Sequence, residues 1–61
     1  MYEKYKELLV KHNKTSYQVS KDTKISQSTL SDWKTGRSAP KADKLKALAD
    51  YFGVTVDYFI N

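Results

Sequence analysis

The sequence predicts an all-α fold made of five short helices. First, hydrophobic residues recur every three or four positions in several segments, which is the spacing of amphipathic helices. Second, residues that commonly cap helices stand at the boundaries of these segments. Third, the alternation of apolar and polar residues that is typical of a strand occurs only over residues 54–56.

The first helix is expected over residues 2–12, because its apolar residues fall on one face and its opposite face is charged. Asn13 follows this segment, and asparagine tolerates the left-handed conformation that ends many helices. The apolar face consists of Tyr2, Tyr5, Leu8 and Leu9.

The second and third helices are expected at residues 16–23 and 27–35, with a short turn between them. Thr15 or Ser16 can cap the second helix and Ser26 can cap the third, because a hydroxyl oxygen accepts a hydrogen bond from the backbone of the first turn. The inward positions of this segment are Val19, Ser20, Ile25, Leu30 and Trp33.

Glycine residues are expected to end the third and fourth helices. Gly36 follows the third helix, and Gly53 follows a fourth helix expected at about residues 41–52. Thr55 can cap a fifth helix at residues 56–60. The inward stripe of the fourth helix consists of Leu45, Leu48, Ala49 and Phe52.

Length and composition restrict the class of protein. Residues 1–61 are expected to form a single domain, because a chain of this length has no room for a second core. The absence of cysteine excludes disulfides, thiolate-ligated zinc and a cysteine nucleophile. No apolar run reaches the roughly 18 residues of a membrane span. We therefore expect a cytoplasmic protein without membrane association.

The net charge of +4 is unevenly distributed. Residues 1–14 carry four lysines against two glutamates, and residues 15–41 carry five basic residues against two aspartates. Residues 42–61 carry two lysines against three aspartates. This excess favours a polyanionic partner, but it is equally consistent with a solubilising surface.

The packing expected for the second and third helices leaves one face of the third helix exposed. Trp33 and Leu30 lie on its buried stripe, so Trp33 is interpreted as a core residue and not as a platform for stacking bases. The exposed face carries hydrogen-bonding side chains and none of the long lysines or glutamates that usually cover a solvated helix. Its residues are Gln27, Ser28, Ser31, Asp32 and Thr35.

At these residues the chain resembles the Cro/repressor-type (XRE-like) helix-turn-helix family, which contains phage lambda repressor and its relatives. Three motifs carry the resemblance: S-Q-S-T-L-S-x-W at residues 26–33, G-x-x-x-P at 36–40, and L-x-x-L-A-x-x-x-G-V-T-V-D at 45–57. A helix-turn-helix spacing alone is a weak signal, but the three motifs in this order are highly specific. The resemblance covers nearly the whole chain and implies a lambda-repressor-like helix-turn-helix domain.

In that family the second helix of the motif lies in the major groove of double-stranded DNA, with its N-terminal residues against base edges. The resemblance therefore implies base contacts by Gln27, Ser28, Ser31 and Asp32. Glutamine can pair with adenine through two hydrogen bonds, serine can meet several bases, and aspartate can accept from cytosine. The resemblance also implies phosphate contacts by Thr15, Ser16, Thr29, Thr35, Arg37 and Lys41. Backbone N–H groups at the start of the second helix would aid these contacts.

The chain departs from the family pattern at positions that affect this site. At the position of Ser16, relatives usually have a glutamine that contacts phosphate and braces the first glutamine of the third helix. Serine is too short for that bracing. Relatives usually have glycine at Lys24, where a lysine with positive φ would store roughly 1 kcal/mol of strain. Many relatives have a paired arginine and glutamate at two positions where this chain has Leu9 and Lys34.

These inferences predict a transcriptional regulator, of the phage or bacterial repressor type, that binds an approximately palindromic operator as a homodimer. In related repressors the last helix often pairs with its mate, so Tyr58 and Ile60 are the candidates for the dimer interface. The alternative, in which Ile60 folds back on Tyr2 or Tyr5, has equal weight.

Two other classes of protein compete with this interpretation. A protein-interaction module on the same fold, such as an antitoxin, would carry an apolar stripe on the third helix or a large hydrophobic surface on the fifth. An enzyme is disfavoured, because the chain has one histidine at a helix end, no clustered carboxylates and no glycine-rich phosphate loop. We expect no cofactor, metal ion or small-molecule ligand, since His12 lacks the further ligands that a metal requires.

Overall fold

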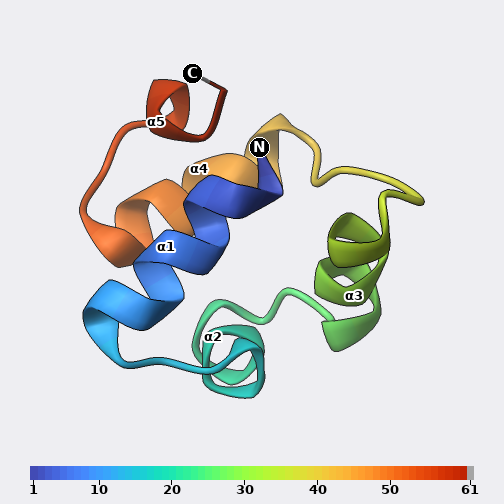
Figure 1. The fold of residues 1–61 in the computed structure, drawn as a ribbon, viewed down its shortest axis with the longest axis horizontal. Helices are drawn as coiled ribbons and strands as arrows, with labels where there is room; N and C mark the ends of the chain where they lie inside the picture. Colours follow the sequence, from blue (N-terminus) through green and yellow to red (C-terminus); the bar gives the residue numbers. More distant parts are fainter. Residues whose placement is uncertain (61) are drawn as a thin grey trace.

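The computed structural model describes residues 1–60, which form five helices and no strand, so the predicted all-α fold class is confirmed (Figure 1). The helices are α1 (Tyr2–His12), α2 (Ser16–Thr23), α3 (Gln27–Thr35), α4 (Ala42–Phe52) and α5 (Val56–Ile60). One boundary differs by a residue from the expected one. Lys41, expected to begin the fourth helix, has an extended backbone and is its N-cap residue. Residue 61 of the predicted domain lies outside the described residues.

The helices are arranged so that α3 lies at the edge of the molecule. Figure 1 shows α1 and α4 at the centre, and the rings of Tyr5 and Phe52, 6.3 Å apart between centroids, join these two helices. Helix α2 packs against both α3 and α4, and α5 packs against both α1 and α4. Helix α3 lies to one side, and the loop at residues 36–41 connects it to α4.

All five helices contribute to one core. Trp33 of α3 is only 5% exposed, and its ring centroid lies 5.1 Å from that of Tyr5, 5.6 Å from that of Tyr2 and 6.1 Å from that of Phe59. The interpretation of Trp33 as a core residue is therefore confirmed. The buried hydrophobic residues are Tyr5, Leu8, Val19, Ile25, Leu30, Trp33, Leu45, Leu48, Ala49, Phe52 and Phe59.

The helix ends follow the local sequence closely. Thr15, and not Ser16, is the N-cap of α2, and it forms a reciprocal capping box with Gln18. Ser26 caps α3 as expected, because its hydroxyl accepts a hydrogen bond of 3.1 Å from the backbone N–H of Thr29. The residues that end α1 to α4 all have left-handed backbones, and they are Asn13, Lys24, Gly36 and Gly53.

The turn between α2 and α3 is held by side-chain hydrogen bonds as well as by burial. The hydroxyl of Ser20 donates to the carbonyl oxygen of Ile25 over 2.6 Å. The hydroxyl of Thr23 donates to the carbonyl oxygen of Val19 over 2.7 Å and accepts from the N–H of Ile25. Ile25 itself is 1% exposed. These contacts set the direction in which α3 leaves the turn.

Lys24 in this turn has a φ of 64°, which lies in the left-handed region that a side chain disfavours. Replacing Lys24 with glycine is expected to raise the free energy of unfolding by roughly 1 kcal/mol. In a domain of this size that corresponds to a rise of about 4–8 °C in melting temperature, measurable by circular dichroism. The matched control is Lys21→Gly, inside the last turn of α2, which should lower the melting temperature. An unchanged or lower melting temperature for Lys24→Gly would refute this explanation.

Candidate nucleic-acid interface

Helix α3 presents one polar face to solvent because its opposite face is anchored in the core. Leu30 is 2% exposed and Trp33 is 5% exposed, and both lie on the inner side of the helix. The structure brings all the predicted base-contact residues together on the outer side. Of these, Gln27, Ser28 and Ser31 are exposed, and Asp32 is half-buried.

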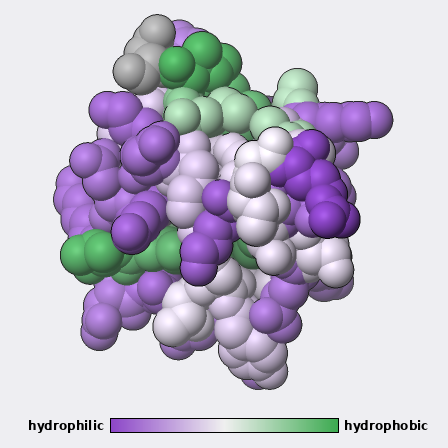
Figure 2. All heavy atoms as spheres, turned by 45° about the vertical axis from the view of Figure 1, so that its right-hand side comes forward, coloured by the Kyte–Doolittle hydropathy of each residue, from purple (hydrophilic) through white to green (hydrophobic). Residues whose placement is uncertain are grey.

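The surface around α3 is predominantly polar. Figure 2 brings the right-hand side of Figure 1 forward, and hydrophilic and intermediate colours cover its middle and lower parts. Hydrophobic colour gathers mainly at the top, with a strip at the left. No exposed residue of α3, which lies wholly within the described residues, is apolar. The apolar stripe that a protein-interaction module would carry on this helix is therefore missing.

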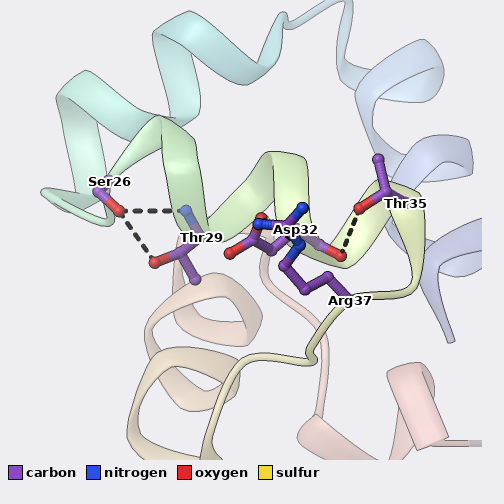
Figure 3. A network of polar contacts seen from close by, with 5 residues as sticks. All are labelled: Ser26, Thr29, Asp32, Thr35 and Arg37. Carbon is purple, nitrogen blue, oxygen red and sulfur yellow. Dashed lines mark hydrogen bonds and ion pairs between the residues drawn. The ribbon is translucent and has the colours of Figure 1, made fainter.

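A polar network at the C-terminal end of α3 involves one predicted base contact and two predicted phosphate contacts (Figure 3). The carbonyl oxygen of Asp32 accepts from the Thr35 hydroxyl over 3.2 Å and from the backbone N–H of Arg37 over 2.9 Å. The Asp32 carboxylate lies 3.9 Å from Nε of Arg37, whose side chain is 80% exposed. Such exposed ion pairs contribute little free energy, so Arg37 can leave Asp32 for another anion at small cost.

The four hydroxyl groups predicted to contact phosphate all have partners within the chain. A hydroxyl has one proton to donate, and Thr35 uses its proton on the Asp32 carbonyl. Thr15 accepts from the N–H of Gln18, and its own proton faces Oε1 of Gln18 across a long 3.5 Å. Thr29 shares a hydrogen bond of 2.9 Å with Ser26. Thr35 is therefore the least available donor of this group.

Ser16, the fourth hydroxyl, pairs with a buried tyrosine instead of with the recognition helix. Its Oγ lies 3.0 Å from the hydroxyl oxygen of Tyr5, and either atom can donate. Burial raises the pKa of Tyr5 above its usual value of 10.0, and the bond to Ser16 opposes this shift only in part. Tyr5 is therefore neutral at physiological pH. The pair ties the first turn of α2 to α1.

A concavity of about 230 Å³ opens where α1, α2 and α3 meet, and we call it the α1–α3 notch. It contains Lys34, which is not among the predicted site residues. The sequence feature that could have indicated Lys34 is the helical spacing of residues 27, 31 and 34, which places them on one side of α3. The lining residues are Tyr2, Ser16, Gln27, Leu30, Ser31 and Lys34.

A second concavity, of about 320 Å³, lies on the other side of α3, against the loop and the start of α4. It brings Thr29 and Lys41 together, two of the predicted phosphate contacts. Thr29 is two residues from both Gln27 and Ser31, so it points to the opposite side of the helix from the α1–α3 notch. The two concavities therefore flank the exposed face of α3.

The candidates for the dimer interface lie on α5 and differ in exposure. Tyr58 is half-buried, and Nζ of Lys4 lies 5.4 Å from the centre of its ring. Ile60 is 62% exposed, so the alternative in which it folds back on Tyr2 or Tyr5 is wrong. Helix α5 thus exposes one large aliphatic side chain and not the extended hydrophobic surface expected of an antitoxin-like module.

Within residues 1–60, no three His, Asp or Glu side chains are grouped in a way that could hold a metal ion. None of the helices in this part of the chain combines the length and the apolar character needed to cross a membrane.

Comparison with known proteins gives two matches. The family model described as Helix-turn-helix matches residues 6–59. The HTH-type transcriptional activator BcrR of Enterococcus faecalis is 29% identical over 59 residues, which is 97% of this chain and 29% of that protein. The chain thus spans less than a third of the length of this relative. No solved structure matches the chain.

Proposed function

The chain belongs to the helix-turn-helix family, and we propose that it is a sequence-specific DNA-binding domain of a transcription regulator. Family membership and the transcriptional relative support DNA binding and the regulation of transcription. The finer proposal is that α3 lies in the major groove of double-stranded DNA, which is wide enough for a helix. The observation that carries it is the exclusively polar outer face of α3, opposite the buried Leu30 and Trp33.

Base readout is assigned to the exposed face of α3. Gln27 and Ser28 stand at its N-terminal end, which approaches the base edges first in helix-turn-helix complexes. Ser31 follows one turn later. Asp32 can accept a hydrogen bond from cytosine N4, and the nearby Arg37 offsets its repulsion by phosphate.

Phosphate contacts are assigned first to Arg37 and Lys41, because both are exposed cations beside α3. Thr15, Ser16 and Thr29 are secondary contacts, since each hydroxyl must keep or exchange a partner within the chain. Thr35 ranks last for the same reason. Backbone N–H groups at the start of α2 can add to these contacts.

We further propose that residues 1–61 act as one domain that binds an approximately palindromic operator as a homodimer, with Tyr58 and Ile60 in the interface. The support is the exposure of Ile60 at the end of α5, in the part of the molecule where Figure 2 shows most of its hydrophobic colour. Two α3 helices would then lie roughly 34 Å apart. The sequence predicts that this protein is a repressor. The relative is named an activator, and DNA binding by α3 would serve either role. The cytoplasmic location stays a prediction.

Selection of bound sequences from a random pool of DNA duplexes, at a stated salt concentration, tests these proposals. We expect an enriched sequence made of two inverted half-sites about 10 bp apart, centre to centre. The control is a triple variant with Gln27, Ser28 and Ser31 changed to alanine, which keeps the buried face of α3 and should enrich no sequence. Failure of the natural protein to enrich any sequence would refute sequence-specific binding. Enrichment of single, unpaired half-sites would refute the homodimer.

A further inference from the structure

The α1–α3 notch is lined by both apolar and polar side chains. Tyr2 and Leu30 are the apolar ones, and the Tyr2 ring is held edge-on to Trp33 at 5.6 Å between centroids. Ser16, Gln27, Ser31 and Lys34 supply hydrogen-bonding groups and one positive charge. Such a mixed lining fits a group that joins C–H surface to an anion, as a deoxyribose phosphate does.

Lys34 alone carries a charge among the residues that line the notch. Its side chain is exposed, and the three ion pairs within residues 1–60 join other groups. Its ammonium group is a compact charge with three donors, which suits a phosphate oxygen. The notch therefore has an unpartnered cation at its edge.

The position of Lys34 on α3 gives this cation a definite role beside a bound duplex. When a helix lies in the major groove, the two DNA strands that border the groove run along opposite sides of the helix. Lys41 lies at the concavity on one side of α3, and Lys34 lies at the notch on the other. Of the predicted phosphate contacts, only the uncharged Ser16 lines the notch.

We propose that the α1–α3 notch binds a phosphate group of the DNA strand that borders the major groove on that side, with Lys34 as its cation. This proposal deepens the proposed function and rests on it.

Ser16 and Tyr2, which also line the notch, support such a contact. The Tyr5 hydroxyl can donate to Ser16 Oγ, which frees the Ser16 proton for a phosphate oxygen. Tyr5 remains protonated for this purpose, because burial raises its pKa. The deoxyribose ring then packs against Tyr2. Ser16 thus presents to the notch a hydroxyl that is fixed by Tyr5 of α1.

The test compares Lys34→Gln with Lys11→Gln, using the operator obtained by selection. Lys11 is also exposed, but it lies on the α1 surface beside Glu7 and Val10, in a concavity that shares no residue with the notch. Affinity is measured by fluorescence anisotropy over a range of salt concentrations. For Lys34→Gln we expect the slope of log affinity against log salt to become less steep by about 0.9, the value for one phosphate contact. For Lys11→Gln we expect no change.

A second arm locates the phosphate. Single neutral methylphosphonate linkages are placed at each position along the operator. We expect at least one linkage that weakens binding of the natural protein but has no further effect on Lys34→Gln. Both variants must melt at the temperature of the natural protein, as expected for exposed substitutions.

The outcomes separate this proposal from the proposed function. An unchanged salt slope for Lys34→Gln, or the same methylphosphonate pattern in both proteins, would overturn the notch proposal while leaving operator binding intact. A loss of affinity restricted to the operator and absent on random DNA would make Lys34 a base contact and also overturn it. If the natural protein prefers no sequence at all, the proposed function itself fails.

Discussion

Replacing Trp33 with alanine is expected to lower the free energy of unfolding by about 3–5 kcal/mol. Trp33 is 5% exposed and packs against the rings of Tyr2, Tyr5 and Phe59, so alanine would leave a cavity shared by three helices. A domain of 61 residues has a total stability of roughly 3–9 kcal/mol. The change is therefore comparable with the whole stability of the domain, and most of the DNA binding should be lost with the fold.

Urea denaturation followed by far-ultraviolet circular dichroism measures this effect without relying on the fluorescence of the deleted residue. Trp33→Phe, which keeps an aromatic ring in the cluster, is expected to lose less stability and to remain folded for measurement. The matched surface control is Tyr17→Ala, because Tyr17 is 61% exposed and its loss should change stability by about 0.5 kcal/mol or less. A Trp33→Ala protein within about 1 kcal/mol of the natural one would contradict the core assignment.

Replacing Gln27 with alanine is expected to relax the preference for one base pair of the operator, at a cost of about 1–3 kcal/mol in discrimination. Gln27 is exposed at the first position of α3, and glutamine can make two hydrogen bonds to adenine. Because its side chain lies outside the core, the folded domain should be unaffected. The measurement is the affinity for a series of operators in which each base pair is changed in turn.

Lys41→Ala is the comparison for this experiment, since a phosphate contact carries no sequence information. It should weaken binding to operator and random DNA alike and reduce the salt dependence. Equal losses on both kinds of DNA for Gln27→Ala would remove Gln27 from base readout.

The helices and their ends could be predicted because their causes are local in the chain. The spacing of apolar residues marked the buried side of each helix, and Ser26 and Gly36 marked the ends of α3 within one residue. The left-handed backbone of Lys24 was indicated only by the family resemblance, in which glycine is usual at this position, and not by a local pattern. The start of α4 was one residue off, because Lys41 caps it without a side-chain hydrogen bond that a pattern could reveal.

The hydrogen-bond partners of some hydroxyl groups could not be predicted from neighbouring residues in the sequence. Ser16 and Tyr5 are 11 residues apart and meet only because α1 and α2 pack together. The same holds for the hydroxyl of Tyr51, which donates to the Asp22 carboxylate 29 residues away, and this bond raises the pKa of Tyr51. Hydroxyls that look free in the sequence are therefore partnered in the fold.

Residue order alone was enough to predict the five helices, the caps of α3 at Ser26 and Gly36, and the polar outer face of α3, because helical periodicity and capping act over a few residues. Helix packing in three dimensions decided which hydroxyls are occupied, that Ile60 points to solvent, and that Lys34 shares a notch with Tyr2 and Ser16. These features depend on the angles and distances at which separate helices cross, and the spacing of residues within one helix does not contain that information.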